Sequence, residues 1–188
     1  HFRNDWGLDF NLGAGRYYEA NTDYLRRYVN LSVWGRLFGN HVNFGSYYEY
    51  SLNYNRGFLA YQGSNWLSYT YSIIPELSVS FNSNLWIEWD ENNEILTMWP
   101  RIRPQLNIRF NSETDLTVFN EIVTNIPGTD IGEIDYLSNR FGLLFSWNFS
   151  PKSWLYIALN DHRTENEEGN LEPIYRISAV KAKYLFYF

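Results

Sequence analysis

Charged and aromatic side chains alternate with apolar ones over much of this sequence, and the polar positions are those that could do chemistry. In the clearest stretch, ILTMWPRIRPQLNIRF at 95–110, one alternate set is apolar and the other is almost entirely polar. Successive side chains of a β-strand point to opposite faces, so this pattern predicts a strand with one apolar and one polar face. With similar segments at 42–54 and 77–90, the candidate polar-face residues are Glu49, Trp86, Glu88, Asp90, Trp99, Arg101, Arg103 and Arg109.

These candidate residues admit two interpretations. Arginines that face carboxylates across an aqueous lumen create a transverse field that orders ions or small polar solutes, and tryptophan rings can guide sugars. Alternatively, the charges pair with one another and fill a narrow interior. If ENNE at 91–94 forms the turn, Trp86 lies about opposite Trp99, and Glu88 lies near Thr97. The sequence leaves open a lumen that selects solutes and a lumen packed with paired charges.

The sequence contains no convincing catalytic or metal-binding constellation. Asp161 and His162 are adjacent and could act as the orienting acid and the base of a hydrolase, but no nucleophile can be placed beside them. The chain has no cysteine, so a disulfide and a thiolate metal site are excluded. Acidic residues that crowd two expected loops are interpreted as solvated charge. We expect no enzymatic activity, no catalytic residue, no cofactor and no metal site.

The composition stands out for its aromatic residues. Eight Trp, sixteen Tyr and thirteen Phe make up 20% of the 188 residues, although the mean hydropathy is only −0.42. Tyr and Trp are favoured where one end of the ring is apolar and the other is wet, as at a membrane interface. No apolar run approaches the roughly 18 residues of a transmembrane helix, so strands would have to cross any membrane. The net charge of −6 argues against a nucleic-acid partner.

The alternating pattern predicts about ten strands in one domain that covers 1–188. Their expected ranges are 1–12, 26–38, 42–54, 65–73, 77–90, 94–110, 115–124, 137–149, 153–163 and 173–188. Connections after strands two, four, six and eight are short, and those after one, three, seven and nine are long; the short connection after strand five is an exception. Such alternation is typical of bacterial outer-membrane barrels. We predict an all-β fold, an antiparallel transmembrane up-and-down β-barrel, closed within this chain or part of a larger barrel.

A soluble β-sandwich or a lipocalin-like barrel shows the same alternation, with its apolar face turned inward. Three features favour the membrane barrel. Several expected strands exceed the usual length of about five or six residues. The polar set contains tryptophans and arginines, which suit a wet lumen better than an outer surface. The apolar set places aromatic residues near strand ends, for example Phe110, Trp147 and Phe149, as an interfacial girdle requires.

The final segment, ISAVKAKYLFYF at 177–188, alternates apolar residues and ends on an aromatic residue. It resembles the C-terminal signature of outer-membrane β-barrels, and the resemblance implies that the barrel assembly machinery recognises Tyr184, Phe186 and Phe188. The segments SYTYSIIPELSVSF at 68–81 and LLFSWNFSPKSWLYIALNDHRTENE at 143–167 are similar to the C-terminal barrel of a large bacterial family. In that family a family-nine-like carbohydrate-binding domain precedes the barrel. Residues 1–188 do not include such a domain, and we expect them to be the C-terminal part of a longer protein.

The pattern and the resemblance together predict a location in the outer membrane of a Gram-negative bacterium. The expected partners are outer-membrane lipid, lipopolysaccharide, the barrel assembly machinery and envelope-complex proteins, with no nucleic acid. Two functions stay open. The barrel is a pore or transporter for ions or small polar solutes, or it is a structural barrel that anchors an upstream domain or serves as a subunit of an envelope complex.

Overall fold

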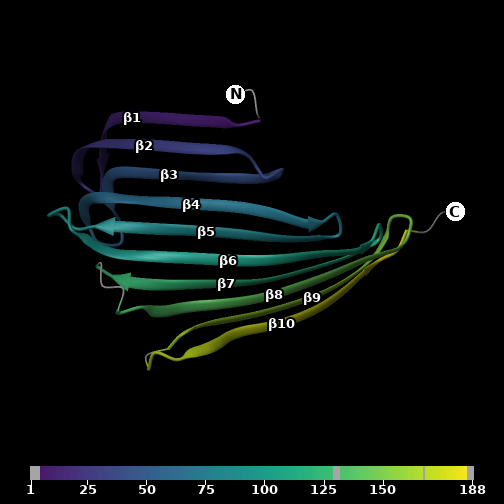
Figure 1. Cartoon of the computed structure of the whole chain (residues 1–188). Coiled ribbons are helices and arrows are strands. Elements are labelled where there is room, and N and C mark those ends of the chain that lie inside the picture. Colours follow the sequence, from purple (N-terminus) through teal and green to yellow (C-terminus); the bar gives the residue numbers. More distant parts are fainter. Residues whose placement is uncertain (1–4, 129–131, 167, 186–188) are drawn as a thin grey trace. The chain divides into compact units, whose positions relative to one another are not determined.

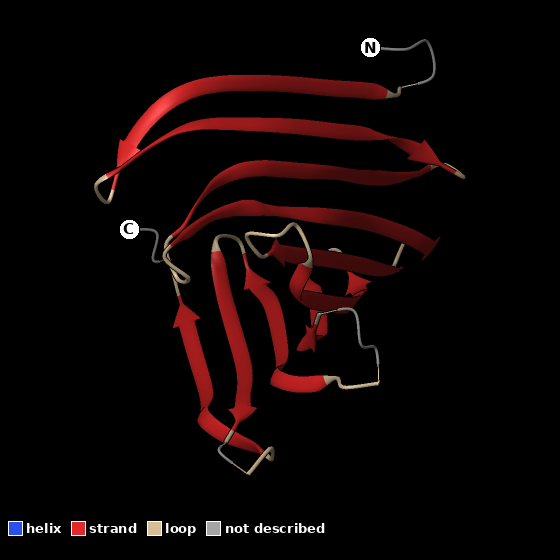
Figure 2. Cartoon of the chain, turned by 90° about the vertical axis from the view of Figure 1, so that its left-hand side faces the viewer, coloured by secondary structure: helices blue, strands red, loops and turns tan. Residues whose placement is uncertain are grey.

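The computed structural model describes residues 5–128, 132–166 and 168–185, and the regular elements in these ranges are all β-strands (Figure 1; Figure 2). Among the described residues, no helix is long and apolar enough to cross a membrane. The expected all-β fold of ten strands is confirmed. The strands are β1 (Gly7–Glu19), β2 (Thr22–Leu37), β3 (Asn40–Asn53), β4 (Phe58–Ile74), β5 (Leu77–Trp89), β6 (Ile95–Asn111), β7 (Thr114–Pro127), β8 (Asp135–Ser150), β9 (Ser153–Glu165) and β10 (Leu171–Lys183).

The strands form one sheet in which each pairs with its neighbours in the sequence, so the order runs from β1 to β10 (Figure 1). Neighbouring strands are antiparallel, and the predicted up-and-down connectivity is confirmed. Strands β1 and β10 are the first and last of this order. Closure of the sheet into a barrel stays a prediction.

The first connection is much shorter than the sequence predicts. A strand at 1–12 and a long loop are expected, whereas β1 continues to Glu19 and only residues 20–21 separate it from β2. Ala20 and Asn21 have positive φ angles of 49° and 61°, as in the type I′ turns that match the twist of a hairpin. Polar residues expected in a loop therefore pair across two strands.

The third connection, between β3 and β4, is shorter than predicted because the side chain of Asn53 closes it locally. The sequence predicts a loop at 55–65, but β4 begins at Phe58. The Oδ1 atom of Asn53 accepts the backbone N–H groups of Asn55 at 3.1 Å and Arg56 at 3.2 Å. This kind of asparagine turn needs few residues, so the following polar segment stays in the strand.

The ninth connection, between β9 and β10, is also shorter than predicted, and an asparagine side chain again closes it. The sequence predicts a loop at 162–173, whereas β9 continues to Glu165 and β10 begins at Leu171. In the loop, Oδ1 of Asn166 accepts the backbone N–H groups of Glu168 at 3.0 Å and Asn170 at 2.9 Å. An asparagine turn again replaces an extended loop.

Shorter and longer connections alternate from β2 onward, as predicted, but the difference in length between them is smaller than predicted. The connections after β2, β4, β6 and β8 contain two residues each, at 38–39, 75–76, 112–113 and 151–152. Those after β3, β5, β7 and β9 are longer, at 54–57, 90–94, 128–134 and 166–170. The connection after β5 thus belongs to the longer class and is not an exception, while the connection after β1 departs from the pattern.

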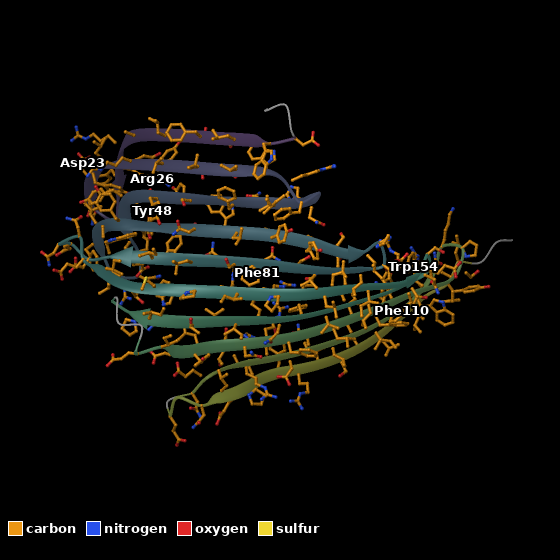
Figure 3. All side chains as sticks on the ribbon, viewed as in Figure 1. Asp23, Arg26, Tyr48, Phe81, Phe110 and Trp154 are labelled. Carbon is orange, nitrogen blue, oxygen red and sulfur yellow. The ribbon has the colours of Figure 1, made fainter. Side chains whose placement is uncertain are left out.

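The burial of side chains is inverted relative to an ordinary soluble domain. Large apolar side chains of the strands are exposed, for example Leu25 at 56% and Phe110 at 59%, and Phe110 is labelled in Figure 3. Polar side chains are buried instead, among them Glu88 at 2% and Thr97 at 4%. Many of the strand residues therefore expose apolar groups, while several polar groups are enclosed by other protein groups.

Close contacts divide the chain into two compact units. Unit 1 consists of the described residues of His1–Tyr69, Asn82–Arg101 and Thr124–Asp135, and unit 2 of the described residues of Thr70–Phe81, Ile102–Val123 and Tyr136–Phe188. Unit 1 thus holds the whole of β1, β2 and β3, whereas unit 2 holds the whole of β9 and β10. Strands β4 to β8 contribute residues to both units.

Candidate functional site

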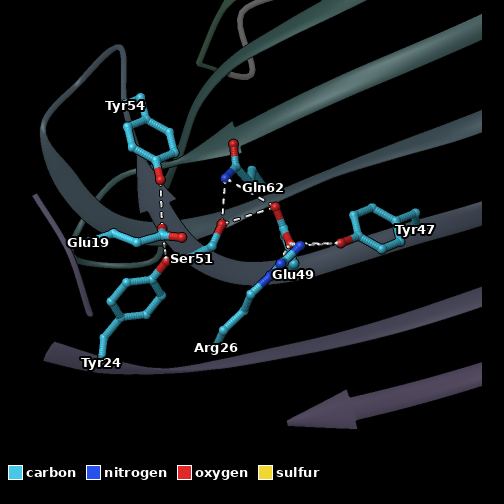
Figure 4. Close-up of polar contacts among 8 residues, drawn as sticks. All are labelled: Glu19, Tyr24, Arg26, Tyr47, Glu49, Ser51, Tyr54 and Gln62. Carbon is cyan, nitrogen blue, oxygen red and sulfur yellow. Dashed lines mark hydrogen bonds and ion pairs between the residues drawn. The ribbon is translucent and has the colours of Figure 1, made fainter. Parts of the chain in front are cut away.

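A dense polar cluster of unit 1 surrounds Glu49 on β3 (Figure 4). We call it the Glu49 network, and its members are Arg26, Tyr47, Glu49, Ser51 and Gln62. The strand register explains why these residues meet. Glu49 lies directly opposite Gln62 of β4 and Tyr28 of β2, and Arg26 is two positions from Tyr28. Opposite residues and those two positions away point to the same face of a sheet.

The carboxylate of Glu49 accepts hydrogen bonds at both oxygens. Its Oε2 atom accepts from Nε of Arg26 at 2.9 Å and from the Tyr47 hydroxyl at 2.7 Å. Its Oε1 atom accepts from the Ser51 hydroxyl at 3.0 Å and the Gln62 amide at 3.4 Å. Only 12% of the Glu49 side chain is exposed. A carboxylate can be buried this deeply because a cation and several donors replace its hydration.

A second carboxylate connects the end of β1 to the 54–57 connection. The Oε2 atom of Glu19 accepts from the Tyr24 hydroxyl at 2.7 Å and from the Tyr54 hydroxyl at 2.6 Å (Figure 4). Donation to the carboxylate stabilises the protonated phenol, which raises the pKa of Tyr54 above its ordinary value. These bonds therefore fix the loop without offering a free acid or base.

Three of the predicted site residues come together in a pocket of unit 1 of about 520 Å³, which we call the tryptophan pocket. They are Trp86 and Glu88 of β5 and Trp99 of β6. The remaining lining residues are Leu52, Asn53, Tyr54, Asn55 and Gln62. Gln62 belongs to the Glu49 network as well, and so connects the predicted residue Glu49 to the pocket.

Glu88 is the charged group of the tryptophan pocket, and its charge is balanced. Nε of Arg56 lies 3.4 Å from Oε2 of Glu88, and Nε1 of Trp86 donates to Oε1 at 3.5 Å. Nearby, Nδ2 of the buried Asn53 has no hydrogen-bond partner among the described residues, since only its Oδ1 atom is used by the loop. The pocket is thus lined by a neutralised carboxylate and by an asparagine whose buried Nδ2 donor is unused.

The other predicted site residues have different surroundings. Asp90 lies in the 90–94 connection, where its Oδ1 accepts the N–H groups of Asn92 and Glu94, each at 2.8 Å. Arg101 is exposed. These two residues of unit 1 do not line the tryptophan pocket.

Arg103 and Arg109 belong to unit 2 and have partners there. The guanidinium of Arg103 lies 4.0 Å from the centre of the Phe119 ring and 3.8 Å from Oε2 of Glu121. Nε of Arg109 donates to Oδ1 of Asp115 at 3.4 Å. Both arginines therefore take part in ion pairs within their unit.

The predicted assembly signal is described only in part. Tyr184 is exposed, and its ring stacks on that of Phe149 with centroids 6.2 Å apart. Phe186 and Phe188 lie outside the described residues. Recognition by the assembly machinery stays a prediction.

The adjacent Asp161 and His162 do not contact each other as a catalytic pair would. Asp161 accepts from Arg163 at 3.2 Å and from Arg176 at 2.9 Å, whereas the ring of His162 meets that of Tyr175 edge-on at 5.1 Å. Consecutive strand residues point to opposite faces, which separates the two side chains. The described part of the chain contains no group of three or more metal-ligating residues.

Sequence reasoning missed Arg26, Arg56 and Phe119 as parts of polar clusters. Arg26 lies at the first position of a predicted strand, and Arg56 lies in a predicted long loop, so no cross-strand partner is assigned to either. Phe119 is the apolar member of an alternating set with Asp115, Thr117 and Glu121. An aromatic ring at such a position indicates that a polar-face side chain packs on it, and Arg103 does so. The errors at Arg26 and Arg56 follow from misplaced turns, because turn positions set the register.

No protein-family model matches this chain, and no curated protein has a significantly similar sequence. The resemblance to a family of bacterial barrels therefore stays a prediction.

Proposed function

We propose that the chain forms an integral outer-membrane β-barrel of a Gram-negative bacterium, with its apolar face against lipid and its polar face lining an aqueous lumen for ions or small polar solutes. The observation that carries this proposal is the inverted burial, with Leu25 and Phe110 exposed while Glu88 is buried. A large exposed apolar surface is unfavourable in water and marks contact with lipid or protein. Lipid-facing barrel strands have this apolar-out, polar-in alternation.

Aromatic residues near the longer connections of unit 1 support an interfacial girdle. The guanidinium of Arg27 lies 5.1 Å from the Tyr50 ring centre and 5.7 Å from that of Tyr61. The rings of Tyr48 and Trp89 meet at 5.8 Å. Amphipathic rings favour the headgroup level, and an arginine there can extend its charge toward lipid or lipopolysaccharide phosphates. Lipid, lipopolysaccharide and, through the C-terminal strand, the assembly machinery are the proposed partners.

Membrane integration is tested by gel mobility. Unheated samples extracted with detergent from outer membranes should migrate differently from boiled samples, because a folded barrel stays compact in the gel. The same protein should remain in the membrane pellet after washing with carbonate. Recovery in the soluble fraction without detergent, with a single gel mobility, contradicts the proposal.

A second candidate function is a silent barrel that anchors an upstream domain or serves as a subunit of an envelope complex. The observation that favours it is the pairing of polar-face charges, including Arg26 with Glu49 and Arg103 with Glu121. Paired charges can fill a small lumen without leaving a path for ions.

Planar-bilayer recordings distinguish the two functions. A pore should give stepwise currents. In a salt gradient, Arg103→Ala should shift the reversal potential toward the equilibrium potential of the cation, because a positive charge of the lumen is lost while Glu121 remains. Arg27→Ala is the matched control, since Arg27 lies on the apolar face and its loss should leave selectivity unchanged. An electrically silent membrane protein supports the anchoring function and excludes the pore.

A further inference from the structure

The tryptophan pocket combines apolar platforms with polar groups in a way that suits a polyhydroxylated ligand. It has a volume of about 520 Å³, within the range of roughly 300–1,000 Å³ typical of small-molecule sites. Two of its lining side chains are the indoles of Trp86 and Trp99. Indoles present broad apolar faces with an N–H at one edge. A sugar ring matches such surfaces, since its C–H groups form an apolar face and its hydroxyls project from the edge.

The polar groups of the pocket complement hydroxyls. Asn53 is only 4% exposed, and its Nδ2 atom is a donor without a partner among the described residues. A buried donor without a partner is costly, so a ligand oxygen that displaces the atoms covering Nδ2 and accepts its hydrogen bond gains affinity. The Glu88 carboxylate and the Gln62 side chain supply acceptors in the same pocket. Hydroxyls both donate and accept, which matches this mixture.

The charge balance argues for a neutral ligand. The Glu88 carboxylate is compensated by Arg56, with 3.4 Å between Nε and Oε2. A cation would have to compete with the guanidinium of Arg56, and an anion would meet the Glu88 carboxylate. A neutral solute avoids both costs and exploits the indole surfaces.

We infer that the tryptophan pocket binds a neutral sugar, with Trp86 and Trp99 as stacking surfaces and with Asn53 and Glu88 as hydrogen-bonding groups. This inference rests on the proposed function in one respect: the pocket opens on the polar face that is proposed to line the lumen. It names the class of small polar solute that the lumen selects.

The test uses the purified full chain in detergent, titrated with glucose, galactose, N-acetylglucosamine and maltose while tryptophan fluorescence is followed. At least one sugar should give a saturable change, whereas sodium glucuronate and sodium phosphate should give none at equal concentration. Trp99→Leu should raise the dissociation constant at least about tenfold, the equivalent of about 1.4 kcal/mol. Trp154→Leu is the matched control and should bind as the unmodified chain does, because Trp154 stacks on Tyr156 in unit 2.

A second variant tests the unused donor separately. Asn53→Asp keeps the Oδ1 acceptor that closes the 53–57 loop but removes the Nδ2 donor. It should weaken sugar binding several-fold while the folded gel mobility persists.

Two results overturn the inference. One is the absence of a saturable signal with any sugar in protein that shows the folded gel mobility; the other is an equal loss of binding in Trp99→Leu and Trp154→Leu. Neither result depends on current through a bilayer, so the pore proposal can survive this failure. Conversely, a silent bilayer together with sugar binding that requires Trp99 rejects the pore and retains the sugar site.

Discussion

Glu49 in unit 1 and Asp115 in unit 2 are both carboxylates paired with an arginine, but their surroundings differ. The Glu49 side chain is 12% exposed and accepts from four residues, whereas the Asp115 side chain is 48% exposed and pairs with Arg109. A buried carboxylate depends on every partner because water cannot replace a lost one. An exposed pair contributes little because water competes for both charges. The apolar faces of the two units are alike, because both expose large apolar side chains.

The largest effect is expected where the two units should behave alike, on their exposed apolar faces. Leu31→Arg in unit 1 and Leu159→Arg in unit 2, two leucines that are each 40% exposed, should each lower the free energy of unfolding by about 2–4 kcal/mol if both positions face the bilayer core. Urea titration of protein folded into lipid vesicles measures the loss.

Ser32→Arg is the control, because Ser32 faces the other way and lies directly opposite Asp9. It should cost far less than Leu31→Arg, since the new cation meets a carboxylate. Equal costs for these two variants would mean that the assignment of faces is wrong, and a large cost at only one of Leu31 and Leu159 would restrict the lipid face to that unit.

The polar faces should respond unequally to the loss of an arginine. Arg26→Leu leaves Glu49 nearly buried without its counter-ion and should lower the free energy of unfolding by about 2 kcal/mol. Arg109→Leu in unit 2 should cost about 0–1 kcal/mol, because Asp115 can be hydrated. Parallel urea titrations give both values, and similar losses would remove the distinction between the units.

Two glycines give a smaller contrast. A Cβ atom on Gly45 would collide with the backbone oxygen of Leu31 and with the Trp66 ring, so Gly45→Ala should cost about 2 kcal/mol. On Gly142 of unit 2 it would collide with the end of the Phe119 ring. That ring can turn away, so Gly142→Ala should cost about 1 kcal/mol.

The double variant Gly142→Ala with Phe119→Leu separates a clash from other effects. It should cost less than the sum of its two single variants, because the smaller side chain leaves room for the new methyl group. Strict additivity would show that the Phe119 ring is not what Gly142 accommodates.

The smallest effect concerns the loops at 90–94 and 166–170. In both, a side-chain oxygen at the first position accepts backbone N–H groups, but the acceptor is a carboxylate in one loop and an amide in the other. Asp90 of unit 1 accepts the N–H groups of Asn92 and Glu94, and Asn166 of unit 2 fills the corresponding role in its loop. The N–H group of Glu94 above all holds the pKa of Asp90 below its ordinary value. The carboxylate therefore stabilises the folded loop above pH about 4, the ordinary value for Asp, and this contribution is lost as the pH falls through the lowered pKa.

Amide resonances measure this difference. Between pH 6 and 2, the Glu94 amide should shift as Asp90 is protonated, whereas the Asn170 amide should not follow that titration because its acceptor is a neutral asparagine. Asp90→Asn should abolish the Glu94 titration while the loop persists. A titration of the Glu94 amide that remains in Asp90→Asn would assign it to another group.

Local patterns predicted the strands well and the turns poorly. Alternation depends on neighbouring residues alone, which is why ten strands and their two faces could be predicted. The turn at 20–21 was missed because Ala20 gives little sign of a positive φ angle. The asparagine turn at 53–57 did leave a signal, since Asn53 is followed by Gly57 at a position with φ of 80°, but the polar residues after it suggested a longer loop.

The candidate site could be predicted only in part for the same reason. Trp86, Glu88 and Trp99 line one pocket and could be grouped from the sequence, because they flank one connection and share a face. Their additional neighbours Asn53 and Gln62 come from β3 and β4. The register of those strands depends on turns that the sequence did not reveal.

The amino-acid sequence by itself determined the alternation of polar and apolar side chains, the all-β class and the number of strands, because each is a property of consecutive residues. The tertiary structure decided which charges are buried. Arg26 reaches Glu49 and Arg56 reaches Glu88 across 23 and 32 positions of sequence. Such contacts depend on turn geometry and strand register, and these also decide that Glu49 is enclosed by donors while Asp115 remains open to water.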